Sequence, residues 1–150
     1  MQLPKPLTSL VATGDSFAPL FLRLALGAMI LPHGLQKTVG WFGGYGFQGT
    51  MGWLTGTVGA PWIVALLAIL AESVGGLMLI LGAGTRPAAV GVGAVMLVAA
   101  KMHLANGFFM NWTGKQAGEG VEFHLLAVGI AVALVILGGG RASVDRALAK

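Results

Sequence analysis

Six charged or imidazole-bearing side chains lie near the ends of three apolar segments, and their types suit proton transfer or anion binding. They are His33, Lys37, Lys101, His103, Glu122 and His124, and they include all three histidines of the chain. Histidine can change its charge near neutral pH, and a lysine ammonium can bind an anion or a quinone carbonyl. These residue types predict a polar pocket, provided that the chain brings the three segments together.

Three interpretations of these six residues stay open. In the first, they cap helix ends and extend their polar groups to the membrane surface. In the second, they form a pocket that relays protons or binds an anion. In the third, two or more histidines bind a metal or a haem, although the sequence has no HxxxH or HxxEH spacing to favour it. We name no residue as a metal ligand, and metal and haem stay open as cofactors beside a quinone.

Two further charged residues, Arg23 and Glu72, fall inside apolar segments. A charge in hydrocarbon is costly, so such residues mark a functional site or a partner for one another. Counting along a helix from the predicted outer ends places both roughly 16–18 Å below the outer surface. We expect an Arg23–Glu72 pair, because two opposite charges desolvated together cost far less than either alone. The pair would either lock the bundle or serve a buried ligand or a proton path.

Four apolar segments have to position these side chains. About 20 helical residues cross a hydrocarbon core, and the predicted spans are 17–35, 61–84, 87–105 and 121–138. Three consecutive glycines from Gly138 end the last span. We therefore divide the chain into a cytoplasmic tail at 1–16, a four-span domain at 17–140 and a basic cytoplasmic tail at 141–150.

The composition agrees with a membrane protein. Of 150 residues, 56% are hydrophobic and 9% are charged, and the mean hydropathy is +0.85. A soluble domain carries about 25% charged residues, and a disordered chain has low hydrophobicity and high charge. The chain has no cysteine, which excludes disulfides, thiolate ligands, a cysteine nucleophile and an internal dithiol relay.

The basic residues are unevenly distributed between the two predicted sides of the membrane. One side holds Lys5, Arg86, Arg141, Arg146 and Lys150, whereas the other holds Lys37 and Lys115, with Lys101 at a helix end. Short cytoplasmic segments are enriched in Lys and Arg, so we expect both termini in the cytoplasm. No two basic residues are adjacent, which argues against a nucleic-acid partner.

The segment between the first two spans is rich in glycine and aromatic residues. Between Val39 and Gly59 it holds eight glycines and five aromatics, among them Trp41 and Trp53. The spacing of Phe47, Met51, Leu54 and Val58 predicts a short helix in the membrane interface. The aromatic side chains either anchor the chain at the headgroups or form a lid over an outward pocket. The predicted fold is all-α, an integral membrane four-helix bundle with this interfacial segment between its first two helices.

Small residues in the spans predict close helix packing. Glycine lets two helix backbones approach within a membrane bundle. The glycines expected to act in this way are Gly75, Gly76, Gly91, Gly93 and Gly129.

Several short motifs together resemble one family. The stretch His33-Gly34-Leu35-Gln36-Lys37, followed by Gly40-Trp41-Phe42-Gly43-Gly44, resembles the HGxxK…GxFGG pattern of the DoxX-like membrane proteins. Glu72 within AESVGG matches the second-span pattern, and Glu122 opens the last span as in the family. The GGGRASVD ending, with Ser143 and Asp145, is similar to GxGxxSxD. The agreement runs from about Phe17 to Asp145, in the same order as in the family.

The resemblance implies a small four-helix protein of the bacterial inner membrane. Named relatives include a subunit of thiosulfate:quinone oxidoreductase, and others associate with redox partners in resistance to oxidative stress. It implies a quinone-linked redox component. We take His33, Lys37, Glu72, His103, Glu122 and His124 as catalytic candidates. The candidates for a quinone or anion pocket are Arg23, Glu72, Lys101 and Trp41.

Two alternatives to a redox component stay open. The chain could be a non-enzymatic scaffold that recruits soluble redox or oxidative-stress enzymes, or a carrier of a small molecule or lipid. The expected partners are the lipid bilayer, a soluble redox enzyme and a second copy of the chain.

Overall fold

The computed structural model describes residues 5–149, which form helices and connecting segments without strands. The predicted tails extend beyond this range at residues 1–4 and at Lys150. The α-helices are α1 (Lys5–Val11), α2 (Ala18–Thr38), α3 (Gly46–Gly56), α4 (Trp62–Leu81), α5 (Thr85–His103), α6 (Glu122–Leu137) and α7 (Val144–Leu148). Short 3-10 helices cover Trp41–Gly43 and Leu104–Asn106.

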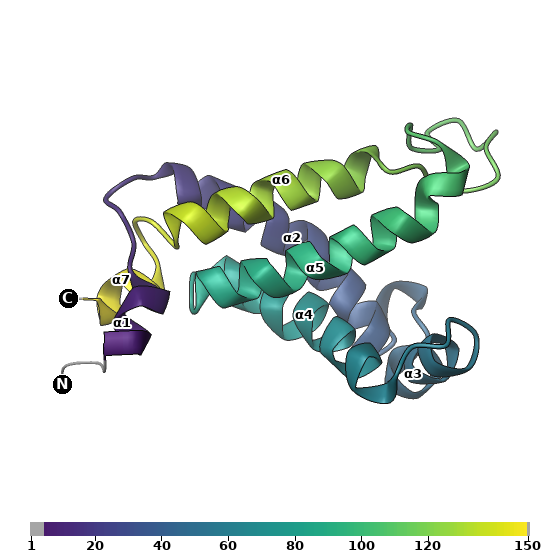
Figure 1. The fold of residues 1–150 in the computed structure, drawn as a ribbon, viewed down its shortest axis with the longest axis horizontal. Coiled ribbons are helices and arrows are strands. Elements are labelled where there is room, and N and C mark those ends of the chain that lie inside the picture. Colours follow the sequence, from purple (N-terminus) through teal and green to yellow (C-terminus); the bar gives the residue numbers. More distant parts are fainter. Residues whose placement is uncertain (1–4, 150) are drawn as a thin grey trace.

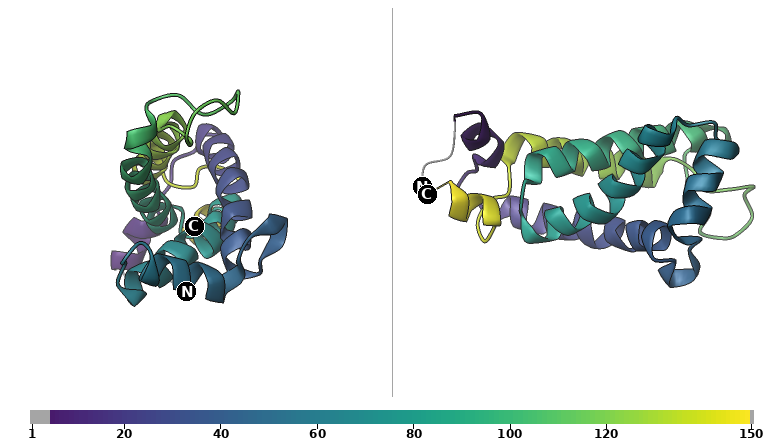
Figure 2. Two further views of the ribbon diagram at one scale, coloured as in Figure 1. Left: turned by 90° about the vertical axis from the view of Figure 1, so that its right-hand side faces the viewer. Right: turned by 90° about the horizontal axis from the view of Figure 1, so that it is seen from below.

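Four long helices form the bundle and confirm the predicted all-α architecture. Helix α2 packs against α4 and α6, and α5 packs against α4 and α6. Helices α1 and α7 lie together at one end, and α3 lies at the other (Figure 1). Figure 2 shows the same arrangement from two further sides, with α3 across the end of the bundle remote from the termini.

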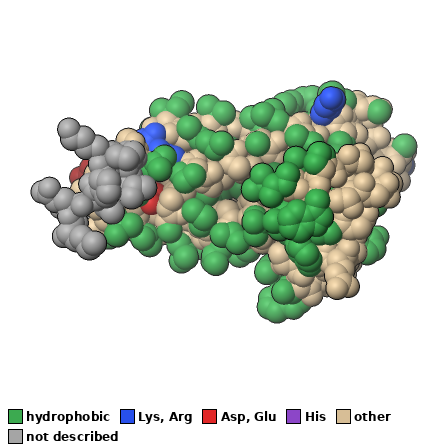
Figure 3. All heavy atoms as spheres, turned by 60° about the horizontal axis from the view of Figure 1, so that its bottom comes forward, with side chains coloured by type: hydrophobic (Ala, Val, Ile, Leu, Met, Phe, Trp, Pro, Cys, Tyr) green, Lys and Arg blue, Asp and Glu red, His purple; other side chains and the backbone are tan. Residues whose placement is uncertain are grey.

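The helices have the length and surface of a membrane protein. Helices α2 and α4, and α5 with its 3-10 extension to Asn106, are each long and apolar enough to cross a bilayer. Helix α6 is also apolar and has 16 residues. Hydrophobic side chains cover the length of the visible face in Figure 3, with most of the charged ones near the end that holds the termini. Such a surface is stable in contact with lipid.

The interior of the bundle is a single apolar cluster contributed by all four long helices. Its members with no exposed surface are Leu26, Ile30, Leu79, Ala89, Val92, Ala127 and Leu134. A smaller cluster joins Met51 of α3 to Ala65 and Ile69 of α4. Helix α3 confirms the predicted short helix, and this contact attaches it to the N-terminal half of α4.

Helix contacts involve four of the five predicted glycines, and also Gly27 and Gly34, which were not predicted. A Cβ on Gly34 would lie 2.4 Å from the Ser73 Cα, so α2 and α4 touch backbone to backbone there. Gly76 and Gly93 also sit in tight contacts with neighbouring helices. A Cβ on Gly129 would have no neighbouring atom within 4 Å among the described residues, so its predicted packing role is wrong.

Candidate functional site

The first polar contact of the site joins the end of α2 to the middle of α4. The Lys37 ammonium forms a salt bridge with the Glu72 carboxylate. The Glu72 side chain is 6% exposed and that of Lys37 is 31% exposed. The close approach at Gly34, one helical turn before Lys37, brings the two side chains together. A buried carboxylate is thus held by a cation that still reaches solvent.

The predicted Arg23–Glu72 pair is wrong. Arg23 bonds to Leu79 and Ile80, seven and eight residues past Glu72 along α4, which is about 10 Å at the helical rise. Counting residues from the predicted helix ends gave the wrong pair because it took no account of the register between α2 and α4. The contact at Gly34 sets this register. Lys37 therefore reaches Glu72, and Arg23 lies near the helix ends on the side of the termini.

Arg23 is fully buried and bonds to backbone carbonyls. Its Nε donates to Gly139 O at 3.1 Å, and its Nη2 donates to Ala142 O at 2.5 Å. Its Nη1 donates to Leu79 O at 3.3 Å and also to Ile80 O. The last carbonyls of an α-helix have no partner within the helix, so Arg23 ties the end of α4 to the turn after α6.

The GxGxxSxD ending belongs to the same structural cluster. Asp145 is buried, and its carboxylate accepts hydrogen bonds from Gly84 N at 2.6 Å and Thr85 N at 2.8 Å. These are amides at the start of α5, where a negative charge is favoured. The Asp145 N in turn donates to Gly82 O at 2.9 Å, and Ser143 accepts a bond as the N-cap of α7. This motif therefore holds helix ends together.

A groove between α4 and α5 has a volume of about 820 Å³. Its apolar wall includes Leu67, Ala71 and Met78 of α4 and Gly91, Ala94 and Val98 of α5. The ionisable side chains that line it are Lys37, Glu72 and His103. The arrangement suits a ligand with an apolar body and a polar group that can hydrogen-bond.

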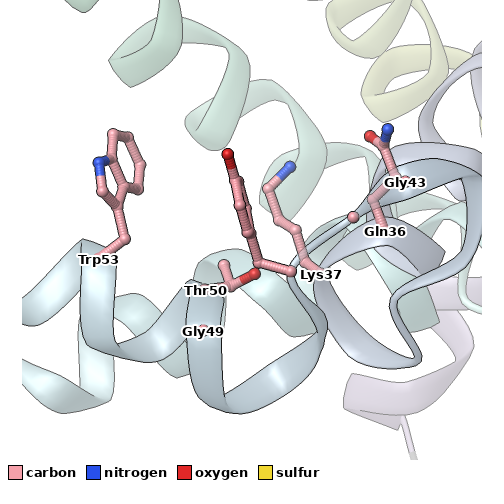
Figure 4. A pocket seen from close by; sticks show the side chains of 8 residues that line it. Gln36, Lys37, Gly43, Gly49, Thr50 and Trp53 are labelled. Atoms are coloured by element: carbon pink, nitrogen blue, oxygen red, sulfur yellow. The ribbon is translucent and has the colours of Figure 1, made fainter.

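A second cavity of about 740 Å³ lies between the end of α2 and α3. Figure 4 shows Gln36 and Lys37 at the end of α2, with Thr50 and Trp53 on α3. Lys37 and Trp53 line both this cavity and the groove. The lysine therefore belongs to the wall that the two cavities share.

Two of the three histidines meet where α5 ends and α6 begins. The rings of His103 and His124 are stacked, with centroids 4.9 Å apart and planes 25° from parallel. His124 is buried, and His103 Nδ1 lies 3.1 Å from Glu119 O. Glu122 lies outside the groove lining and accepts a hydrogen bond from Trp112 Nε1 at 3.1 Å.

The remaining candidates lie apart from this site. His33 and Lys101 are exposed, and Trp41 is exposed on the 3-10 helix after α2. None of the three lines either cavity. Among the described residues, no group of three or more His, Cys, Asp or Glu side chains could hold a metal ion.

The apolar groove between α4 and α5 was not predicted, nor was Trp53 predicted to line it. An apolar groove leaves no motif, because its lining has the same composition as a lipid-facing helix surface. Gly34 was the available signal, since a glycine one turn before a lysine near a helix end permits the approach that pairs Lys37 with Glu72.

One comparison with known proteins matches this part of the chain. The family model described as DoxX matches residues 18–112, well over half of the sequence. The matched range contains α2 to α5, and so includes Lys37, Glu72 and His103. No curated protein and no solved structure matches the chain.

Proposed function

The chain belongs to the DoxX family, and from this premise we propose that it is a quinone-linked redox component of the bacterial inner membrane. The observation that carries the proposal is the groove between α4 and α5, whose apolar wall also contains Lys37, Glu72 and His103. A quinone has a planar head with two carbonyl oxygens and an apolar tail. The groove offers matching surfaces to both parts.

The residues present fit a quinone head. The Lys37 ammonium can donate a hydrogen bond to a carbonyl oxygen, and its salt bridge with Glu72 fixes its position. Glu72 can exchange a proton with a ligand oxygen, because its carboxylate is buried in the same wall. Surrounding aliphatic side chains exclude water and strengthen these polar interactions.

Electrons have to come from outside the chain in this proposal. A bound quinone takes up two electrons and two protons on reduction. The sequence has no cysteine for a dithiol relay, so we assign electron delivery to a soluble redox partner. The cavity beside α3 shares Lys37 and Trp53 with the groove, which makes this end of the bundle suitable for such a partner.

Quinone binding to two matched variants tests the proposal. Ala94 lines the groove, whereas Val90, one turn earlier on α5, is exposed outside it. We expect the purified protein to bind a short-chain quinone in equilibrium dialysis. Ala94→Trp, which fills the groove, should weaken binding at least about tenfold, and Val90→Trp should leave it unchanged.

Two outcomes would contradict the proposal. One is the absence of quinone binding by the native protein, and the other is an equal effect of both tryptophans. Co-purification of soluble redox enzymes without quinone binding would instead support the scaffold alternative, and quinone-independent flux of a small molecule into proteoliposomes would support the carrier.

A further inference from the structure

His103 connects the groove to a second, buried histidine. It lines the groove on α5, and its ring stacks on that of His124 at the start of α6. His124 is 7% exposed, and its Nδ1 has no hydrogen-bond partner among the described residues. Phe123 packs edge-on against the His124 ring, with centroids 5.6 Å apart. These contacts therefore fix the ring of His103, the member of the pair that lines the groove.

The hydrogen bond of His103 determines which of its ring nitrogens carries the proton. Its Nδ1 lies 3.1 Å from Glu119 O, and a carbonyl oxygen can only accept a hydrogen bond. The Nδ1 of neutral His103 must therefore bear hydrogen, and its Nε2 is then an acceptor. A second proton would bind at Nε2 and turn that atom into a donor.

The two stacked rings can hold only one positive charge favourably. Like charges at this separation disfavour each other, and burial further disfavours a charge on His124. The added proton therefore belongs to His103, which is partly exposed. On the elements around the pair, the charged and titratable groups from the middle of the bundle to the end remote from the termini are His33, Lys37, Glu72, Lys101, Lys115, Glu119 and Glu122.

Most of these groups are engaged or exposed. Glu72 is bound by Lys37. Glu119 Oε2 accepts from Asn111 N at 2.7 Å, and Glu122 accepts from Trp112. His33, Lys101 and Lys115 are exposed. His103 is thus the group in the groove that is free to change its hydrogen-bonding role at Nε2.

We propose that His103 recognises the oxidation state of a quinone in the groove, with His124 as the positioning residue that holds its ring. Protonated His103 donates from Nε2 to a quinone carbonyl, and one proton is taken up from water on binding. Neutral His103 accepts at Nε2 from the hydroxyl of a quinol, and no proton is taken up. This inference rests on the proposed quinone site.

Opposite pH dependences for the two ligands follow from this arrangement. Oxidised quinone should bind most tightly at low pH, and its affinity should fall about tenfold as His103 loses its proton, because one charge-assisted hydrogen bond is lost. The quinol, kept reduced under anaerobic conditions, should bind more tightly as pH rises over the same range.

The experiment measures Kd for a short-chain quinone and its quinol from about pH 5.5 to about pH 8.5. His103→Gln carries an amide that donates at every pH, so its quinone affinity should be independent of pH. His124→Ala should weaken binding of both ligands, and His124→Phe, which keeps an aromatic ring in the stack, should restore it. His33→Gln alters the exposed third histidine and should keep both native slopes.

Calorimetry of the native protein supplies a readout that needs no variant. Titrating quinone in two buffers of different ionisation enthalpy should show uptake of up to about one proton, and titrating quinol should show release of up to about one proton. Flat pH profiles, equal slopes for both ligands, or a native slope in His103→Gln would overturn the inference while leaving quinone binding in place. Absence of binding at every pH would contradict the proposed function, and the inference with it.

Discussion

The carboxylate of Glu72, on α4, is buried in the bundle. Among the described residues, the Lys37 ammonium is the cation that contacts it. An ammonium compensates a carboxylate with one strong contact, whereas a guanidinium can serve several acceptors at once. The molecule uses each group accordingly. Arg23 binds four backbone carbonyls at the end near the termini, and Lys37 compensates the charge in the groove.

Removing the cation should be worse than removing both charges. Lys37→Met leaves Glu72 as an unpaired buried carboxylate, and we expect a loss of about 3–5 kcal/mol in unfolding free energy. Lys37→Met combined with Glu72→Gln should recover most of that loss. Denaturant unfolding in detergent measures the unfolding free energy of the native protein, the two single variants and the double variant. Losses of unfolding free energy that simply add would show that the two side chains do not interact.

Arg23 should be structural, with its effect confined to stability. Arg23→Met leaves helix-terminal and turn carbonyls unsatisfied, so unfolding free energy should fall by at least about 3 kcal/mol. The folded fraction of the variant should retain the native quinone Kd, because Arg23 does not line the groove. A specific loss of quinone affinity at unchanged stability would contradict this assignment.

The crossing of α2 and α4 is the contact between elements that shapes the site. A methyl group on Gly34 would meet the backbone of Glu72 and Ser73 at 2.4–2.5 Å. Gly34→Ala should separate the helices and cost roughly 2–3 kcal/mol, with weaker quinone binding, because Lys37 moves away from Glu72.

A second glycine provides the matched control for this crossing. Gly129, inside α6, has open space around it, so Gly129→Ala should be neutral or stabilise the protein by up to about 1 kcal/mol. Thermal unfolding and quinone titration of both variants make the comparison. Equal behaviour of the two variants would show that the close approach at Gly34 has no role.

The sequence was informative about the helices and less so about their register. Apolar length placed all four long helices within a few residues, three of them long enough to cross a bilayer, and the spacing of Phe47, Met51 and Leu54 predicted α3. The register of two packed helices depends on which small residues touch. Residue type alone does not distinguish Gly34 from the other glycines among the 25 in the chain. The Arg23–Glu72 prediction failed for this reason, although both residues were correctly placed inside spans.

Ionic contacts join the two ends of the chain at the end of the molecule that holds α1 and α7. The Asp15 carboxylate binds both Nε and Nη2 of Arg141, at 2.5 and 2.9 Å, and also contacts Arg146 at 2.6 Å. Hydrogen bonding from Arg141 holds the pKa of Asp15 well below its ordinary value of 3.8. The same bond raises the pKa of Arg141.

A depressed carboxyl pKa stabilises the folded state at pH values above the unfolded pKa, and the contribution is lost as pH falls further. The attachment of the 141–146 segment should therefore be constant down to about pH 4 and weaken below it. Protection of that segment from hydrogen exchange, relative to the intrinsic rate at each pH, should then fall by roughly a few-fold, because the contact is exposed to solvent. Asp15→Asn should show the lower protection at every pH, and an unchanged native protection profile would contradict the contact.

The candidate site could be predicted only in part, because it emerges from the whole bundle. Residue types identified Lys37, Glu72 and His103 as chemically capable. Their common position on one groove depends on contacts among α2, α4 and α5 that no single segment encodes. His33 and Lys101 carry the same kinds of side chain as His103 and Lys37, yet they lie on exposed faces of their helices.

Photolabelling is the most direct test of the central claim that the groove between α4 and α5 binds a quinone. A photoreactive short-chain quinone would be crosslinked to the purified native protein, with and without excess unlabelled quinone, and the labelled peptides identified by mass spectrometry. The label should fall on groove residues of α4 and α5 and disappear with competitor. Label spread over the lipid-facing sides of α2 and α6, or insensitive to competitor, would contradict the claim.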